Sequence, residues 1–149
     1  MNHLEATKSV VGHTENLTAA QTHTLTIDTL GYAYVSVDVC QEAFANAGYT
    51  SQAAFTVLKL EESDNNSSYS NVTAFVGGGT GGFTIPTPSS TSADVVVRMD
   101  VDCRGRKRYL KLTATPFTTG TVYTVARLGK GTDGPVSASA KGVNTTVSG

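Results

Sequence analysis

The stretch RGRKRYLKL, residues 104–112, is the most charged part of the chain and the first candidate for chemistry. It holds five of the eleven Lys and Arg residues, namely Arg104, Arg106, Lys107, Arg108 and Lys111. Guanidinium and ammonium groups bind carboxylates and phosphates through charge-assisted hydrogen bonds. The stretch therefore has three interpretations: a solvated turn, a clamp on a carboxylate-rich partner, or a nucleic-acid contact.

The overall charge balance argues against the nucleic-acid interpretation. The net charge is −1 at pH 7, whereas a dedicated nucleic-acid binder usually carries a large positive excess. Only Tyr109 is close enough to the basic cluster to stack on a base, and no long helical pattern is present to enter a groove. We expect no direct binding of nucleic acid.

The acidic segment that contains Glu61, Glu62 and Asp64 is the natural counterpart of the basic cluster. It lacks the fixed ligand order of an EF-hand loop, so we expect a solvated turn rather than a calcium site. Its charge also suggests that it receives the basic cluster of a neighbouring subunit.

The remaining reactive residues predict no catalytic, metal or cofactor site. The histidines His3, His13 and His23 are ten residues apart, unlike the ligand pairs of structural zinc sites. Cys103 follows the apolar positions of its strand, so we expect a buried thiol, and Cys40 shares a face with polar residues. We expect two unpaired thiols and no enzymatic activity.

Two glycine-rich runs resemble nucleotide-binding loops only superficially. GGGTGG, residues 77–82, is not followed by Lys-Ser or Lys-Thr, and GKGT, residues 129–132, lacks the rest of a phosphate-binding loop. Both are predicted to be flexible connections that can lie against a neighbouring protein.

The elements that position these residues are predominantly strands. Apolar and polar residues alternate in seven segments, which are 23–29, 32–40, 53–62, 71–76, 93–103, 109–115 and 121–128. We predict an all-β protein, an antiparallel, jelly-roll-like β-sandwich over residues 21–129. An immunoglobulin-like sandwich is the alternative, although the chain has no Trp.

The two ends of the chain lack enough apolar residues to form a core of their own. Residues 1–20 are predicted to form an extended N-terminal arm or a short edge strand. Residues 130–149 are predicted to form a polar tail that is flexible or becomes ordered on a partner. No apolar stretch is long enough for a transmembrane helix, and we expect no membrane contact.

A hairpin between 93–103 and 109–115 best accounts for the basic cluster. A turn at Gly105-Arg106 places Val101 opposite Leu110, and Met99 opposite Leu112, on one apolar face. It also places Asp100 opposite Lys111 on the polar face. This register predicts that Arg104, Arg106, Lys107 and Arg108 project from the hairpin tip.

The segment 93–129 carries a family resemblance. Its Asp-bearing strand, basic turn, Arg-Tyr-Leu-Lys-Leu strand at 108–112, Thr-Pro step at 115–116 and final strand ending at Gly129 resemble capsid decoration, or cement, proteins of tailed bacteriophages. The resemblance implies a β-rich protein, made in the host cytoplasm, that binds the outside of the expanded head as a homo-oligomer. The implied partners are the major capsid protein and further copies of itself, as a homotrimer or alternatively a homodimer.

The residues expected to contact these partners come from several parts of the chain. They are the N-terminal residues His3, Leu4, Val10 and Val11, the glycines Gly78 and Gly79, the basic residues 104–108 and the acidic pair Glu61 and Glu62. Two other functions remain open. One is a different virion part, such as a head-completion or tail protein. The other is a carbohydrate-binding β-sandwich that uses its tyrosines.

Overall fold

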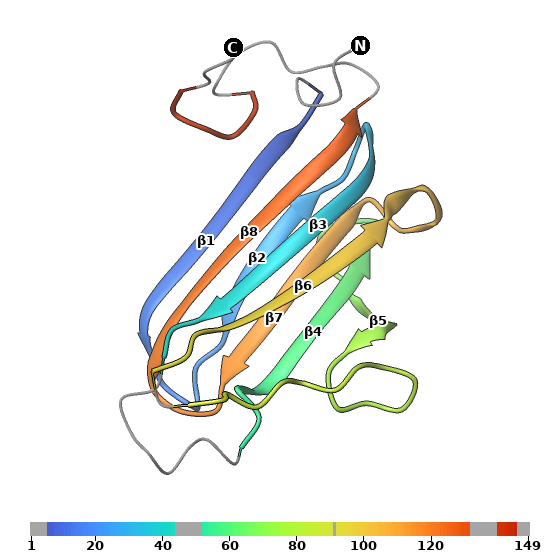
Figure 1. Ribbon diagram of the computed structural model, residues 1–149. Helices are drawn as coiled ribbons and strands as arrows, with labels where there is room; N and C mark the ends of the chain where they lie inside the picture. The colour runs from blue at the N-terminus through green and yellow to red at the C-terminus, as the bar shows by residue number, and fades with distance from the viewer. Residues whose placement is uncertain (1–5, 44–51, 91, 132–139, 146–149) are drawn as a thin grey trace.

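The computed structural model describes residues 6–43, 52–90, 92–131 and 140–145. These residues form two four-stranded sheets packed face to face (Figure 1). The strands are β1 (Lys8–Leu17), β2 (His23–Asp28), β3 (Tyr32–Gln41), β4 (Phe55–Ser63), β5 (Ser70–Val76), β6 (Val95–Asp102), β7 (Tyr109–Pro116) and β8 (Gly120–Gly131). Among the described residues, no helix has the length and apolar character needed to cross a membrane.

The strand order identifies a jelly roll. Sheet A has the order β1-β8-β3-β6, and sheet B has the order β2-β7-β4-β5. All of these pairings are antiparallel, and the chain repeatedly changes sheet between consecutive strands. This arrangement confirms the predicted all-β, jelly-roll-like β-sandwich.

The core lies between the sheets and follows the alternation of the sequence. Val35, Val37 and Val39 of β3 point inward from sheet A, and Leu110 and Leu112 of β7 point inward from sheet B. All five side chains have 1% exposure or less. Burial of side chains of this size stabilises the fold by about 1.5–3 kcal/mol each.

The predicted hairpin between β6 and β7 is wrong. β6 pairs with β3 in sheet A, where Met99 lies opposite Val37, whereas β7 pairs with β2 and β4 in sheet B. Between them, the 3-10 turn η2 (Cys103–Gly105) and the residues that follow carry the chain from one sheet to the other. The apolar faces of β6 and β7 therefore meet across the core and not within one ladder.

The ionic partners predicted from that register change with it. The Asp100 carboxylate accepts a hydrogen bond from Ser36 Oγ at 2.6 Å and does not face Lys111. Lys111 pairs instead with Glu61, at 3.2 Å. Arg98 pairs with the Asp38 carboxylate of β3, at 2.7 Å.

The N-terminal segment adopts the edge-strand alternative over residues 8–17. β1 pairs along β8, with Val11 opposite Val125 and His13 opposite Tyr123, so the sandwich begins at Lys8 and not at residue 21. The opposite edge of β1 is contacted by the C-terminal tail, because Ser9 N donates a hydrogen bond to Lys141 O at 2.7 Å. The two terminal segments thus meet at one end of the sandwich.

Candidate protein interface

The basic residues 104–108 lie in the connection from sheet A to sheet B. Asp102 caps η2 by accepting a hydrogen bond from the Arg104 backbone N–H. The Arg104 guanidinium also donates to both oxygens of the same carboxylate, at 2.9 and 2.5 Å. These hydrogen bonds lower the pKa of Asp102 to about 2. One carboxylate thus shapes the turn and neutralises its first arginine.

Arg108 at the other end of the turn is neutralised by β2. Its guanidinium donates to the two oxygens of Asp28 at 2.9 and 2.7 Å. These side-chain hydrogen bonds hold the pKa of Asp28 below its usual value. The pairing follows from the β2–β7 register, in which Asp28 lies opposite Tyr109.

The acidic segment at the end of β4 receives the middle of the basic turn within the same chain. The Arg106 guanidinium lies 3.8 Å from the Glu62 carboxylate, which also accepts a hydrogen bond from the Lys107 backbone N–H. Lys107 Nζ lies 3.3 Å from Asp64. The charge complementarity seen in the sequence is therefore satisfied inside one subunit.

Each of the four cations in the turn has its own carboxylate, so the turn presents little uncompensated charge. The side chains of all four are more than a third exposed, and exposed pairs of this kind contribute about 0–1 kcal/mol each. A partner phosphate or carboxylate would have to compete with these pairs. This arrangement corresponds to the solvated-turn interpretation.

A second ionic cluster lies on the outer side of sheet B. Glu61 has only a 12% exposed side chain, and it accepts from Lys59, Lys111 and Thr113 at 3.1, 3.2 and 3.0 Å. Burial alone would raise the pKa of Glu61, but these hydrogen bonds outweigh burial and lower it. Glu61 is therefore committed to holding its own sheet together.

The glycine run after β5 forms a closed loop held by backbone hydrogen bonds. Gly78 N donates to Phe83 O at 2.9 Å, and Gly82 N donates to Gly79 O at 3.0 Å. Gly78 has a φ of 72°, and a Cβ on Gly82 would lie 1.9 Å from Val76 O. The loop lies at the far end of the sandwich from the basic turn (Figure 1).

The outer surface of sheet A carries an apolar patch that the sequence analysis did not identify. The strand registers place two neighbouring rows side by side across the four strands. One row is His13–Tyr123–Cys40–Val96, and the other is Val11–Val125–Asp38–Arg98. We call the six residues Val11, His13, Cys40, Val96, Tyr123 and Val125 the apolar patch.

The exposure of the apolar patch is unusual for this chain. Val11, Val96, Tyr123 and Val125 are 63, 60, 46 and 36% exposed, and only Leu30 and Val57 are comparable among the described residues. The His13 ring stacks on Tyr123, with 4.4 Å between centroids and 12° between planes. A contiguous apolar surface of this kind is typical of a protein contact site.

One signal in the sequence could have revealed the apolar patch. In β6 and β8, apolar residues occupy both alternating sets, so that Val96 and Val125 point outward while Val95 and Ala126 point inward. A strand that covers only a core needs one apolar face. Of the N-terminal contact candidates, Val11 belongs to the apolar patch, Val10 packs against the core, and His3 and Leu4 lie outside the described residues.

A shallow groove of about 480 Å³ lies next to the apolar patch on the same side of sheet A. Its accessible lining is mainly apolar, and the polar residues that border it include Tyr34, Ser36, Asp100, Asp102 and Arg127. Hydroxyl, carboxylate and guanidinium groups at these positions can form hydrogen bonds to a polar ligand such as a sugar.

The tyrosines of the described residues are already engaged in contacts within the chain, and Tyr49 lies outside those residues. Arg104 and Lys130 lie 4.9 and 5.3 Å from the centre of the Tyr34 ring. Lys111 lies over Tyr69 in the same way, Arg108 lies over Tyr109, and Tyr32 packs against the core. Together with the His13–Tyr123 stack, these contacts occupy ring surface that a sugar platform would need to expose.

The thiols and histidines form no metal-binding cluster among the described residues. Both cysteines are unpaired; Cys103 is buried and Cys40 is half-buried, as expected. Burial raises the pKa of the Cys103 thiol to about 11, so it is protonated at neutral pH. Burial, followed by the charges of Asp94 and Glu42, also raises the pKa of Cys40.

His23 links the two sheets through buried hydrogen bonds. Its Nδ1 and Nε2 lie 2.8 and 3.0 Å from the hydroxyls of Thr14 and Thr124, which belong to sheet A. Burial, and then the charge of His13, lower the pKa of His23 below 6.5. The unfolded chain therefore binds a proton more readily than the folded chain as the pH falls through 6.5.

We expect the folded protein to lose stability as the pH is lowered from 7.5 to 5, and His23→Gln to remove part of that dependence. Urea unfolding at the two pH values measures the effect. His13→Gln is the control and should keep most of the dependence, because the His13 side chain is 39% exposed. Equal dependence in wild type and His23→Gln would contradict this prediction.

Comparisons with known proteins show solved structures with a similar path of the backbone, and no similar sequence. Neither a protein-family model nor a curated protein sequence matches the chain. The SPBc2 prophage-derived protein YomS is 12% identical with a TM-score of 0.45, covering 83% of this chain and 93% of YomS. The CBM22-1 xylan-binding domain of Paenibacillus barcinonensis Xyn10C is 13% identical with a TM-score of 0.45, covering 83% and 82%.

An empty virus-like particle of Cowpea mosaic virus provides a third similar structure. Its chain is 10% identical with a TM-score of 0.46, covering 88% of this chain and 85% of the viral chain. At these identities and TM-scores, the similarities carry no conclusion about family or function.

Proposed function

We propose that this chain is a non-enzymatic structural protein of a virion. It binds the outside of a tailed-phage capsid as a homo-oligomer and stabilises the head lattice. The apolar patch is the observation that carries the proposal, because it gives a rigid sandwich an exposed surface suited to protein contact. The resemblance of segment 93–129 to capsid decoration proteins supplies the class of partner.

The distribution of charge is consistent with that role. The four cations of the basic turn are matched by carboxylates of the same chain, which leaves little free positive charge for nucleic acid. The terminal segments meet at one end of the sandwich through the Ser9–Lys141 hydrogen bond. That end would present both segments to the capsid lattice, and several weak contacts per oligomer would add by avidity.

Co-sedimentation tests this proposal. The purified chain is mixed with expanded, DNA-free capsids of a candidate tailed phage, and the mixture is pelleted at physiological salt. We expect saturable pelleting with the capsids and no pelleting alone. A variant that lacks residues 1–5 should bind more weakly, because it lacks His3 and Leu4, which are among the proposed partner contacts. Wild-type protein that stays in the supernatant at every capsid concentration would contradict the proposal.

Carbohydrate binding is the second candidate, and the groove beside the apolar patch is the observation that favours it. Binding on a glycan array that Tyr34→Ala abolishes, together with no capsid binding, would replace the structural proposal by this one. The cations over Tyr34 make the groove a poor stacking platform, so we expect no such binding.

A further inference from the structure

We propose that two copies of this chain pack face to face through the outer surface of sheet A, related by a twofold axis that runs across the strands. The inference rests on the proposed homo-oligomeric function and deepens it by assigning the subunit interface. It follows from the apolar patch and from the distribution of charge on either side of it.

The apolar patch lies at the middle of the outer surface of sheet A. On β8 it is formed by Tyr123 and Val125, which flank the buried Thr124. Val11 and His13 extend it onto β1, and Val96 extends it onto β6. It therefore crosses all four strands, which allows a second sheet to lie over it as sheets pack in a sandwich.

One end of this surface is acidic. The Glu42 backbone N–H donates to Thr121 O of β8 at 3.0 Å, and the Asp94 carboxylate accepts from the Ala43 backbone N–H at 2.9 Å. Glu15 lies at the end of β1 on the same side as His13, whose ring is 3.7 Å from its carboxylate. Among the described residues, no Lys or Arg forms an ion pair with these three carboxylates. After burial, the charges of Asp94 and Glu42 contribute to the raised pKa of Cys40.

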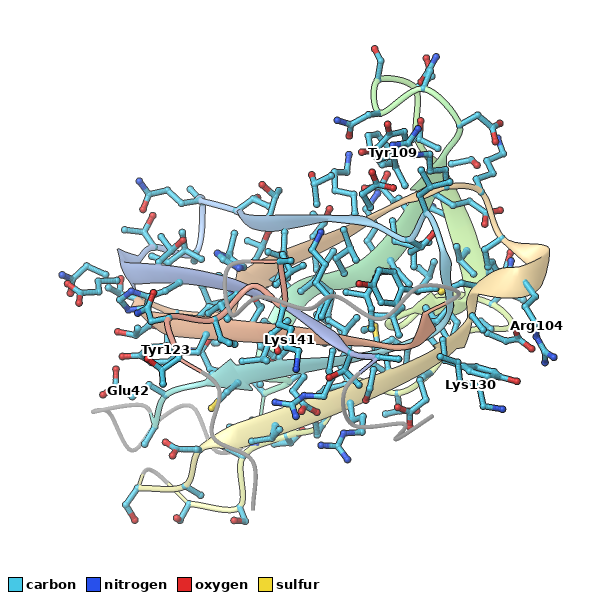
Figure 2. All side chains as sticks on the ribbon, turned by 90° about the horizontal axis from the view of Figure 1, so that it is seen from above. Glu42, Arg104, Tyr109, Tyr123, Lys130 and Lys141 are labelled. Carbon is cyan, nitrogen blue, oxygen red and sulfur yellow. The ribbon has the colours of Figure 1, made fainter. Side chains whose placement is uncertain are left out.

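The opposite end of this surface is basic on balance. Arg127, Lys130 and Arg104 project there, against the carboxylates of Asp100 and Asp102. Figure 2 shows the separation directly, with Glu42 and Tyr123 at one end of the molecule and Arg104 and Lys130 at the other. The two ends of this surface, along the strand direction, therefore carry opposite charge.

This difference in charge between the two ends determines the orientation of the second copy. A twofold axis along the strands would place acidic end on acidic end, whereas an axis across the strands places acidic on basic. Thr121 precedes Thr124 by as many residues as Arg127 follows it. A twofold axis at Thr124 therefore brings the Arg127 row of one copy over the Glu42 row of the other, with the apolar patches in contact between them.

The size of the surface sets the expected affinity. Four strands about 4.8 Å apart and seven residues rising about 3.3 Å each give a planar footprint of roughly 400 Å². A standard interface buries about 800 Å² per partner. We therefore expect a dimer with a dissociation constant in roughly the micromolar range, which requires measurement over a concentration series.

The first test compares charged substitutions that are matched for exposure. Val125→Glu and Val11→Glu change the apolar patch at side chains that are 36 and 63% exposed. Val57→Glu and Leu30→Glu change side chains that are 37 and 65% exposed elsewhere on the surface. Sedimentation equilibrium of the full chain should show a dimer whose dissociation constant rises about tenfold or more in the first pair and less than about twofold in the controls.

The second test determines the orientation. In the proposed arrangement, Glu42→Lys weakens the dimer because it faces Arg127 of the partner copy, and adding Arg127→Glu restores affinity. With the axis along the strands, Glu42→Lys would instead strengthen the dimer by relieving repulsion between acidic ends. Strengthening, or failure of the double variant to recover, would overturn the orientation.

Three mass results would overturn the interface itself. These are a monomer at every concentration, a trimer, or a dimer that Val125→Glu and Val11→Glu leave intact. Capsid co-sedimentation separates this failure from failure of the proposed function. A wild-type chain that pellets with capsids but shows one of these masses would retain the function and lose the interface. A patch-dependent dimer that never pellets would retain the interface and lose the function.

Discussion

Replacing Leu112 with alanine lowers the free energy of unfolding by about 3 kcal/mol. Leu112 is fully buried in β7, with Leu25 of β2 and Leu60 of β4 opposite it in sheet B. Its side chain is directed at the inner side of sheet A, so its loss leaves a cavity lined from both sheets. Such cavities collapse only partly, which is why the expected loss exceeds that of simple apolar transfer.

Urea unfolding followed by far-ultraviolet circular dichroism measures this loss at one fixed protein concentration, because the proposed dimer would add to apparent stability. Leu30→Ala is the matched control. Its side chain is 65% exposed, and the substitution should change the free energy of unfolding by less than about 0.5 kcal/mol. A loss below about 1 kcal/mol for Leu112→Ala would mean that the sheets do not pack closely at this position.

Local alternation of residue types was sufficient to locate the strands and their buried faces. In the alternating segment 32–40, the valines Val35, Val37 and Val39 occupy every second position, and all three are buried. The reason is physical, because successive side chains of a strand point to opposite sides of a sheet. The segment 8–17 was harder to recognise, since its outward positions include the apolar Val11 and its pattern ends in a bulge before Leu17.

Alternation could not determine which strands pair. Met99 and Leu112 both point into the core, and that pattern is the same whether they are neighbours in one ladder or face each other from two sheets. The Asp102 cap on η2, and the pairing of Met99 with Val37, resolve the alternative. The cap is a local contact, but the pairing of Met99 with Val37 joins distant parts of the chain, which local residue patterns do not report.

In the candidate interface too, the sequence predicts the residue types but not their partners in space. The basic residues were evident from composition, but their carboxylate partners depend on which strands lie beside β7. Asp28 reaches Arg108 from β2, and Glu62 reaches Arg106 from β4. The apolar patch depends even more on topology, because β1, β3, β6 and β8 become neighbours only in the folded sheet.

Replacing Glu61 with alanine lowers the free energy of unfolding at pH 7 by about 2–3 kcal/mol. The substitution leaves Lys59 and Lys111, which are 26 and 27% exposed, as two close positive charges without the carboxylate between them. It also removes the acceptor of the Thr113 hydroxyl. The partial exposure of both lysines keeps the expected loss below that of a fully buried pair.

The pH dependence of this loss follows from the lowered pKa of Glu61. A carboxyl group with a lower pKa in the folded state stabilises the fold above its unfolded pKa, which is 4.5 for Glu61, and this stabilisation disappears as the pH falls through the folded pKa. The difference between wild type and Glu61→Ala should therefore be largest near pH 7 and shrink below pH 4.5. Urea unfolding at pH 7, 5 and 3.5 measures it.

Two further variants separate the charge of Glu61 from its shape. Glu61→Gln keeps an acceptor of similar size and should lose roughly half as much free energy as Glu61→Ala, because a neutral hydrogen bond is about half as strong as a charge-assisted one. Glu15→Ala removes a carboxylate whose side chain is 70% exposed and should cost less than about 0.5 kcal/mol. If Glu61→Ala and Glu15→Ala lower the free energy of unfolding by the same amount, solvent alone compensates the charges of Lys59 and Lys111. Glu61 would then not hold the outer side of sheet B together.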